Sequence, residues 1–195
     1  MTARSVEYIK GCAKIEECPQ DGAPEIAFIG RSNVGKSSLI NFLLGRKIAY
    51  VSGTPGKTQL IHFFRINQRF YLVDLPGYGY ARAPREERAR WGPMVESYLL
   101  KRNVLRGIVF LIDIRHSPQP LDLQMKEWLD HYSLPTLYVV TKGDKIGWGK
   151  RKERLNEIKE AFDAPHLLLT SVQAKEGRSA LWEEIEKLLL EKAPI

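Results

Sequence analysis

The chain is poor in metal-binding side chains: it has two cysteines, Cys12 and Cys18, and four histidines in 195 residues. A structural zinc site needs about four closely spaced ligands, and here the histidines are scattered singly along the chain. The composition therefore argues against a zinc protein. The cysteines could form a redox pair or half of a metal site, but we interpret them as free thiols in a reducing compartment.

Long apolar runs are also missing. A membrane-spanning helix needs about 18 consecutive apolar residues, and the segment Gly107–Ile112 is among the longest apolar runs in the chain. Residues 1–17 carry charges throughout and have no apolar core of the kind found in signal peptides. We expect a cytoplasmic protein with no membrane span. It should fold as a monomeric single domain over residues 1–195, with an N-terminal extension at residues 1–22.

Negative charge is scarcer than positive charge, with 23 acidic against 30 basic residues and a net charge of +7. Two segments concentrate the excess. Seven basic and three acidic residues lie between Arg82 and Arg106, and five basic residues and one glutamate lie between Lys145 and Arg154. Such segments are either solvated helix faces or surfaces for a polyanion such as nucleic acid, and charge alone does not separate the two.

Short apolar runs alternate with segments of helical periodicity, which is typical of βαβ units and a largely parallel sheet. Strands are predicted at residues 25–29, 61–66, 70–74, 107–113, 136–141 and 166–170. Helices are predicted at residues 36–44, 85–100, 121–132, 150–162 and 179–191. The gap between the second and third strands is too short for a crossover helix, so these two should be antiparallel neighbours. We predict an α/β fold with a mostly parallel six-stranded sheet, one antiparallel strand and helices on both faces.

Apolar residues at helical spacing mark the faces expected to lie in the core. These residues are Trp91, Val95 and Tyr98 in the second helix, Leu121, Met125, Trp128 and Tyr132 in the third, and Leu181, Ile185 and Leu188 in the last.

The motif G-x-x-x-x-G-K-S lies between the first predicted strand and the first predicted helix. In that position several backbone N–H groups meet at a helix N-terminus, where they bind polyphosphate oxygens. Lys36 is expected to reach the β- and γ-phosphates, and the Ser37 hydroxyl is expected to ligate Mg²⁺. The predicted phosphate contacts are Gly30, Arg31, Ser32, Asn33, Val34, Gly35, Lys36 and Ser37.

A second motif, D-x-x-G, ends the third predicted strand as Asp74, Leu75, Pro76 and Gly77. The carboxyl end of a parallel strand faces the ligand crevice of an open α/β sheet. Asp74 can hold Mg²⁺ there through water, and the Gly77 N–H can meet a γ-phosphate. The chain should therefore bind a nucleoside triphosphate.

The base is predicted from Thr141, Lys142, Gly143 and Asp144, which follow the fifth strand. Asp144 can accept hydrogen bonds from guanine N1–H and the 2-amino group. Adenine would leave that carboxylate unpaired, and such a mismatch can discriminate by about 10⁴ or more. The Lys142 stem is expected to pack on the base. Thr170, Ser171 and Val172 follow the last strand, and the Val172 N–H can donate to guanine O6.

The polar segment from Ser52 to Gln59 should form a switch loop, because a switch needs a threonine that ligates Mg²⁺ only when the triphosphate is bound. Thr54 and Thr58 are both candidates, and we choose Thr58 because it is closer to the second strand. The contacts predicted in and directly after this loop are Gly56, Lys57, Thr58, Gln59 and Leu60.

Four segments, GRSNVGKSSLIN, TPGKTQLIHFF, DLPGYGYA and TKGD, together resemble the EngB family of GTPases, within the TrmE-Era-EngA-EngB-Septin-like superfamily. The resemblance spans nearly the whole chain. It implies a Ras-like GTPase fold and a role in assembling the large ribosomal subunit, with that subunit's precursor and its rRNA as partners. It also implies a requirement in cell division and septation, Mg²⁺ ligation by Thr58, and a catalytic set of Lys36, Thr58 and Gly77.

The resemblance also bears on hydrolysis. Tyr78 follows Gly77 where many regulatory GTPases have a water-orienting glutamine, which implies slow intrinsic hydrolysis. Asn33 resembles a position that helps hold K⁺ in potassium-stimulated relatives, or it only suits the backbone of the loop. Two alternatives to a cycling GTPase remain: a GTP-binding RNA- or scaffold-associated factor without significant hydrolysis, and an ATP-dependent small-molecule kinase. The kinase is disfavoured by Asp144 and by the lack of an obvious acceptor-substrate domain.

Overall fold

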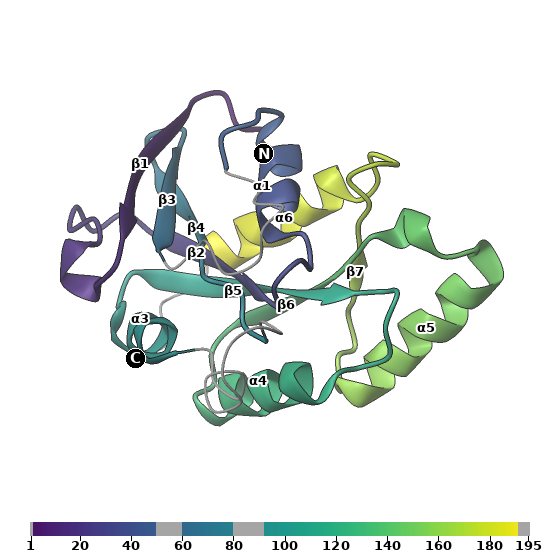
Figure 1. Cartoon of the computed structure of the whole chain (residues 1–195). Helices are drawn as coiled ribbons and strands as arrows, with labels where there is room; N and C mark the ends of the chain where they lie inside the picture. The colour runs from purple at the N-terminus through teal and green to yellow at the C-terminus, as the bar shows by residue number, and fades with distance from the viewer. Residues whose placement is uncertain (1, 50–59, 80–91, 191–195) are drawn as a thin grey trace.

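The fold is built around one seven-stranded sheet with the strand order β1-β3-β4-β2-β5-β6-β7 (Figure 1). The structure is a computed structural model that describes residues 2–49, 60–79 and 92–190. The strands are β1 (Val6–Cys12), β2 (Glu25–Gly30), β3 (Ile61–Ile66), β4 (Phe70–Asp74), β5 (Leu105–Asp113), β6 (Thr136–Thr141) and β7 (Leu168–Leu169). Strand β3 runs antiparallel to both of its neighbours, and the remaining pairs are parallel. The predicted mixed sheet with one antiparallel strand is confirmed.

The strand that the sequence did not predict is β1. It lies within the N-terminal extension and pairs antiparallel with β3 at the edge of the sheet. Its pairing register shifts between Tyr8 and Lys10, so the two faces of the strand do not alternate regularly in the sequence. An edge strand with a bulge loses the period-two pattern on which strand prediction depends. The predicted six-stranded sheet is therefore one strand short.

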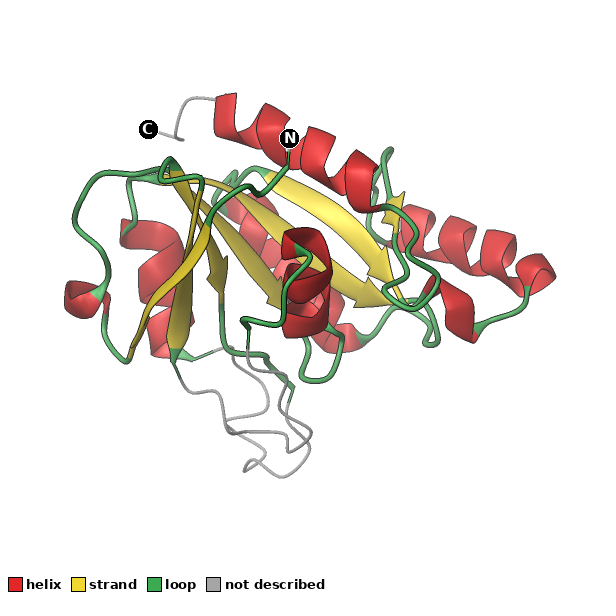
Figure 2. Ribbon diagram, turned by 90° about the horizontal axis from the view of Figure 1, so that it is seen from above, coloured by secondary structure: helices red, strands yellow, loops and turns green. Residues whose placement is uncertain are grey.

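The helices cover both faces of the sheet, as predicted (Figures 1 and 2). They are α1 (Lys36–Leu44), α3 (Pro93–Lys101), α4 (Pro120–His131), α5 (Trp148–Ala161) and α6 (Arg178–Leu190). Helices α1 and α6 pack with Ile26, Phe28 and Leu72 in one apolar core. Helices α3, α4 and α5 pack over the opposite face in a second core around Phe110. None of the described helices is both long enough and apolar enough to cross a bilayer.

Two predictions about helices need correction. The helix predicted over residues 85–100 does not run unbroken through Gly92, whose φ is 83°: helix α3 begins at Pro93, because proline suits the first helical turn and a glycine with this φ does not continue a helix into it. Residues 85–91 of that prediction lie outside the described residues. In α4, Met125 is buried, but Tyr132 is 42% exposed because the helix has already ended before it. The burial of Val95 and Tyr98 is confirmed, as is that of Leu181, Ile185 and Leu188. Trp91 lies outside the described residues.

Cys12 and Cys18 are free and buried. The Cys12 thiol donates to the Glu17 carbonyl at 3.3 Å, and burial raises the pKa of Cys18 to about 12. No group of three or more metal-binding side chains occurs among the described residues. The two cysteines therefore act as small apolar side chains between the N-terminal segment and the sheet.

The topology places the carboxyl ends of several parallel strands at one edge of the sheet. Strand β2 lies between β4 and β5. The strands β3 and β4 were therefore added on one side of β2, and β5, β6 and β7 on the other. Such a switch point opens a crevice at the carboxyl ends of the parallel strands. Asp74 of β4 pairs with Phe28 of β2, and Asp113 of β5 pairs with Thr141 of β6. The loops that follow these four strands therefore gather around one crevice.

Candidate nucleotide-binding site

The G-x-x-x-x-G-K-S segment forms the turn between β2 and α1, as predicted. Three of its residues adopt positive φ angles, 158° at Gly30, 65° at Asn33 and 109° at Gly35, and Gly35 is the N-cap of α1. Asparagine and glycine tolerate this region better than other residues. Val34 is only 3% exposed and anchors the loop in the core under α1. The loop is therefore held open in front of a helix N-terminus.

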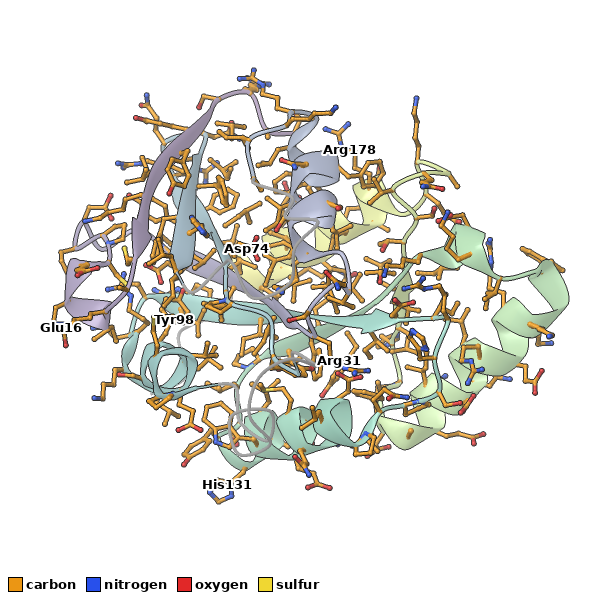
Figure 3. The ribbon with its side chains drawn as sticks, in the orientation of Figure 1. Glu16, Arg31, Asp74, Tyr98, His131 and Arg178 are labelled. Atoms are coloured by element: carbon orange, nitrogen blue, oxygen red, sulfur yellow. The ribbon has the colours of Figure 1, made fainter. Side chains whose placement is uncertain are left out.

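The Ser37 hydroxyl lies next to the Asp74 carboxylate. It donates to Asp74 Oδ2 at 2.7 Å, which joins the start of α1 to the end of β4. Asp74 is labelled in Figure 3. Burial raises the pKa of Asp74, although the Lys36 ammonium and the Ser37 hydrogen bond act in the opposite direction. Burial also lowers the pKa of Lys36, against the attraction of Asp74. The Ser37 hydroxyl, the Asp74 carboxylate and the Lys36 ammonium therefore lie close together in a site shielded from solvent.

Gly77 makes a close approach to the phosphate loop. A Cβ atom at this position would lie 2.9 Å from Lys36 Nζ and 3.0 Å from the Ser32 backbone nitrogen, so any side chain would displace Lys36 and press on the phosphate-loop backbone. The Ser32 N–H donates to the Tyr78 carbonyl at 2.8 Å, and the Ser32 hydroxyl donates to the Gly77 carbonyl at 3.3 Å. The structure thus brings D-x-x-G and the phosphate loop together. Leu75 is fully buried beneath them.

Asp144 lies at the other end of the phosphate loop, in the short helix η2 (Gly143–Lys145) after β6. The Ser171 hydroxyl donates to Asp144 Oδ1 at 2.6 Å, and Lys145 lies 3.1 Å from Oδ2. The hydrogen bond from Ser171 is the main cause that lowers the pKa of Asp144. Ser171 therefore orients the carboxylate and keeps it ionised, a function that the sequence did not predict for it.

A pocket of about 200 Å³ separates the phosphate loop from this carboxylate. Val34 and Gly35 line one side, and Asp144 and the 39%-exposed Val172 line the other. The Thr170 side chain is almost fully buried and donates to the Val140 carbonyl at 3.1 Å, so it holds β7 against β6. The remaining lining residues are Ser38, Leu39, Thr141, Lys142, Lys145, Thr170 and Gln173.

Lys142 bridges the two halves of the site. It adopts a φ of 63°, and its ammonium donates to the Asn33 carbonyl at 2.6 Å and to Asp113 Oδ2 at 2.7 Å. The Thr141 hydroxyl makes a parallel tie, donating to the Val34 carbonyl at 2.9 Å. The Lys142 stem is thereby stretched along the floor of the pocket between the base loop and the phosphate loop.

Two residues that support this site were missed by sequence reasoning. Hydrogen bonds from Arg115 and Lys142 lower the pKa of Asp113 to about 2 against the effect of burial, so it is a permanent anion for Lys142. Its place at the carboxyl end of β5 was the signal that could have identified it. Arg151 donates to the Gly143 carbonyl at 2.7 Å and supports the base loop from α5. No sequence signal marks Arg151, since it is one of many basic residues there.

Tyr78 points away from the phosphate loop. Its ring is 4% exposed and packs edge-to-face on Phe110, and its hydroxyl donates to Asp122 Oδ1 of α4 at 2.7 Å. Burial raises the pKa of Asp122 to about 6. Arg31, which is labelled in Figure 3, lies beside this pair and lines a pocket of about 140 Å³ that also includes Asp122. The Tyr78 hydroxyl is therefore hydrogen-bonded inside the protein and does not face the phosphate loop.

Several predicted contacts are not placed by the structure. Thr54, Gly56, Lys57, Thr58 and Gln59 lie outside the described residues, as does most of the first basic segment. Leu60 is described directly before β3, where its side chain lies next to Gly11 of β1.

Comparison with known proteins places this site in a family. The sequence profile described as "50S ribosome-binding GTPase" matches residues 25–142. The chain is 49% identical over 185 residues to the probable GTP-binding protein EngB of Syntrophus aciditrophicus, covering 94% of both chains. It is 46% identical over 196 residues to the protein of that name from Clostridium perfringens, covering 98% of this chain and 100% of the relative.

Solved structures of related proteins have the same fold. The crystal structure of a probable GTP-binding protein engB superposes with a TM-score of 0.71 at 26% identity, over 85% of this chain and 98% of that one. Era in complex with MgGDPNP and nucleotides 1506–1542 of 16S ribosomal RNA superposes with a TM-score of 0.66 at 26% identity, over 89% of this chain and 59% of Era. The profile match and the near full-length similarity show that the chain belongs to the 50S ribosome-binding GTPase family, among the EngB GTP-binding proteins.

Proposed function

We propose that this protein is a GTP-hydrolysing switch that assists assembly of the large ribosomal subunit in the cytoplasm and is needed for normal cell division and septation. The observation that carries the nucleotide part is the placement of Asp144, oriented by Ser171, across one pocket from the phosphate loop. The family description supports the large-subunit part, and the Era complex with 16S ribosomal RNA supports only contact with ribosomal RNA in general.

Guanine specificity follows from the charge state of Asp144. An ionised carboxylate only accepts hydrogen bonds, so it pairs with the guanine N1–H and 2-amino donors and rejects adenine, which presents an acceptor at N1. Ser171 and Lys145 hold the carboxylate in place before the base arrives. The Lys142 stem would then lie against the base while its ammonium stays with Asp113 and Asn33.

The phosphate end suits Mg²⁺. Magnesium binds few protein ligands and completes its octahedron with water and substrate phosphates. The Ser37 hydroxyl and the Asp74 carboxylate are the oxygen donors that would hold it, directly and through water, with Thr58 as the switch ligand. The ion would neutralise phosphate charge, while Lys36 would contact the β- and γ-phosphates and the Gly77 N–H would meet the γ-phosphate.

Slow intrinsic hydrolysis is supported by the position of Tyr78. A water-orienting group must lie within hydrogen-bond reach of the attacking water. The Tyr78 hydroxyl is instead bound to the buried Asp122. We propose that the chain by itself leaves the attacking water poorly positioned and acts as a slow timer.

A potassium ion near Asn33 is part of the proposal. The positive φ of Asn33 is explained by the loop backbone alone, and its carbonyl is bound by Lys142, so the side chain is the group that remains for an ion. Equal GTP turnover in KCl and NaCl would contradict a potassium site.

The proposal is tested by co-sedimentation of the protein with large ribosomal subunits in the presence of a non-hydrolysable GTP analogue, GDP or no nucleotide. We expect the monomeric protein to co-sediment in the GTP-analogue state and to be released in the GDP state. ATP binding as tight as GTP binding would contradict the GTPase assignment. Turnover at the background rate even with subunits present would favour the non-cycling scaffold.

A further inference from the structure

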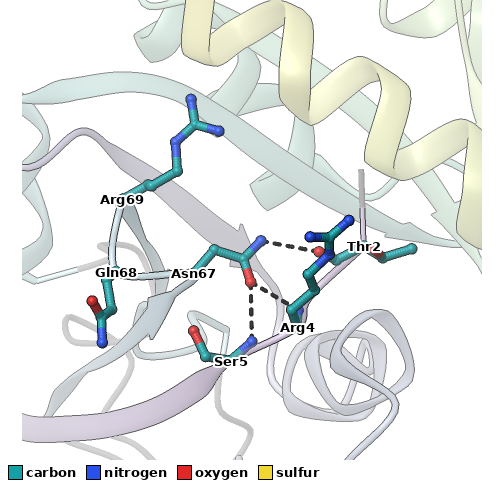
Figure 4. A pocket seen from close by; sticks show the side chains of 6 residues that line it. All are labelled: Thr2, Arg4, Ser5, Asn67, Gln68 and Arg69. Atoms are coloured by element: carbon teal, nitrogen blue, oxygen red, sulfur yellow. Dashed lines mark hydrogen bonds between the residues drawn. The ribbon is translucent and has the colours of Figure 1, made fainter.

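A second hollow, of about 770 Å³, lies beside the turn that joins β3 to β4 (Figure 4). This turn precedes β4, whose last residue is Asp74 at the phosphate loop, so the hollow lies at the opposite end of the sheet from the nucleotide site. Residues from the N-terminus of the chain form its other wall. The lining residues are Thr2, Arg4, Ser5, Asn67, Gln68 and Arg69.

The hollow is organised by hydrogen bonds of the Asn67 side chain. Asn67 Oδ1 accepts the backbone N–H groups of Arg4 at 2.7 Å and Ser5 at 3.0 Å, and Nδ2 donates to the Thr2 carbonyl at 3.0 Å (Figure 4). The turn is tight, with φ of 50° at Asn67 and 57° at Gln68. One amide therefore fixes the two chain segments that carry Arg4 and Arg69.

The charge of the hollow is of one sign. None of the described residues that line it carries a carboxylate, and their side chains offer guanidinium, hydroxyl and amide donors. Within the described part of the chain, neither Arg4 nor Arg69 forms a salt bridge. Both guanidinium groups extend to the same side of the turn in Figure 4, whereas Gln68 extends the other way.

The basic segment from Lys145 to Arg154 provides a contrast. Lys145 pairs with Asp144, Arg151 with Glu176 and Arg154 with Glu157. These three charges are therefore paired within the protein, whereas Lys150 and Lys152 of the same segment form no salt bridge with the described residues. Among the described residues, Arg4 and Arg69 have no acidic partner of this kind, although Arg69 also borders a neighbouring hollow that includes Glu186.

We propose that this hollow binds the phosphodiester backbone of RNA through Arg4 and Arg69, irrespective of the bound nucleotide. The inference rests on the proposed ribosomal function, since the precursor subunit would supply the RNA. Guanidinium groups bind phosphate oxygens bidentately, and the absence of aromatic side chains from the lining favours backbone contact over base stacking. Its distance from the crevice and the fixed Asn67 turn leave it unchanged between the GTP and GDP states.

The test is a salt titration of the binding of an end-labelled, mixed-sequence single-stranded oligoribonucleotide to the full-length protein, once with a GTP analogue and once with GDP. The logarithm of the RNA-binding constant K falls linearly with the logarithm of the salt concentration. For single strands, each lost phosphate contact makes this slope less steep by about 0.7. Arg4→Gln with Arg69→Gln should therefore reduce the slope by about 1.4 in both nucleotide states. GTP affinity and the melting temperature should not change.

A matched control removes two exposed positive charges on α5, Lys152→Gln with Lys159→Gln. It should leave the slope unchanged. An equal reduction in the control would show an effect of net charge and overturn the proposal. So would an unchanged slope in the Arg4 and Arg69 variant, a change in one nucleotide state only, or binding of an acidic peptide but not of the oligoribonucleotide. Co-sedimentation of the wild-type protein with subunits reports separately on the proposed function.

Discussion

At the scale of single residues, the site depends on side chains that fix the position of other side chains through hydrogen bonds and ion pairs. Asp144 is oriented by Ser171, and Lys142 is held by Asp113 and by the Asn33 carbonyl. These partners fix the charge and direction of the predicted base-reading groups before any ligand binds. Such preorganisation lowers the cost of binding because little has to be reordered.

Asp144→Asn should exchange the preference for guanosine for a preference for xanthosine nucleotides. Xanthine has a carbonyl in place of the 2-amino group, and an asparagine amide can donate to it. We expect GTP affinity to fall by at least about 100-fold, because the guanine donors lose their carboxylate acceptor.

Competitive nucleotide titration would measure this exchange. Asp163→Asn, in the exposed turn after α5, is the matched control and should leave nucleotide preference unchanged. If the Asp144 variant still preferred GTP, Asp144 would not be the base reader.

At the scale of elements, the segment after β4 is tied to α4. The Tyr78 hydroxyl donates to Asp122 in the first turn of α4, and Leu121 of α4 lies 3.2 Å from where a Gly79 Cβ would be. Any change in the path of this segment must therefore break or carry along a buried hydrogen bond. A movement of the segment after D-x-x-G would therefore be transmitted to helix α4 through Asp122.

The same pair predicts a pH dependence of stability. Burial raises the pKa of Asp122 from 3.8 to about 6, so between these values the folded state holds a proton that the unfolded state has lost. The contribution of Asp122 to the free energy of unfolding should fall as the pH rises from 4 to 6 and stay constant above that. Two pKa units correspond to about 3 kcal/mol.

Urea unfolding at a series of pH values would measure this effect in the wild type and in Asp122→Asn, which cannot titrate. The difference between the two proteins should change by about 3 kcal/mol from pH 4 to pH 7. Tyr78→Phe should enlarge the change, since the Tyr78 hydrogen bond opposes the effect of burial on this pKa. Parallel profiles of wild type and Asp122→Asn would contradict the assignment.

At the scale of the whole molecule, one buried ion pair joins three parts of the chain. Glu25 at the start of β2 is fully buried, pairs with Arg102 after α3 and accepts the Tyr98 hydroxyl at 2.7 Å. Arg102 also donates to the Pro19 carbonyl at 2.8 Å. The pair therefore connects the N-terminal segment, the central strand and the helix α3.

Arg102→Met should destabilise the protein by about 3–5 kcal/mol, because it leaves the Glu25 carboxylate buried without a countercharge. Glu25→Gln together with Arg102→Met should recover much of that loss, since no charge then remains buried. Chemical denaturation would measure both. Lys187→Met, which breaks an exposed pair with Glu184, is the control and should have little effect. Equal losses in the single and double variants would mean that packing, and not the buried charge, is responsible.

The sequence by itself determined the order of the strands from β2 onward and the residues of the proposed nucleotide site. Short-range signals sufficed for α1, which begins at Lys36 and ends at Leu44 as predicted, and for β3, β4 and β6, whose bounds match the predictions. The phosphate loop, Asp74 with Gly77, and Asp144 were identified because each motif directly follows a strand. Parallel strands bring their carboxyl ends together whatever the details of packing.

Only the tertiary structure decided the rest. The bulged edge strand β1 depends on its partner β3, and the break before Pro93 overrode the helical pattern. The functions of Ser171, Asp113 and Tyr78 come from partners 27, 29 and 44 residues away. Contacts at such separations leave no local pattern, because they form only when the sheet has placed the strand ends side by side.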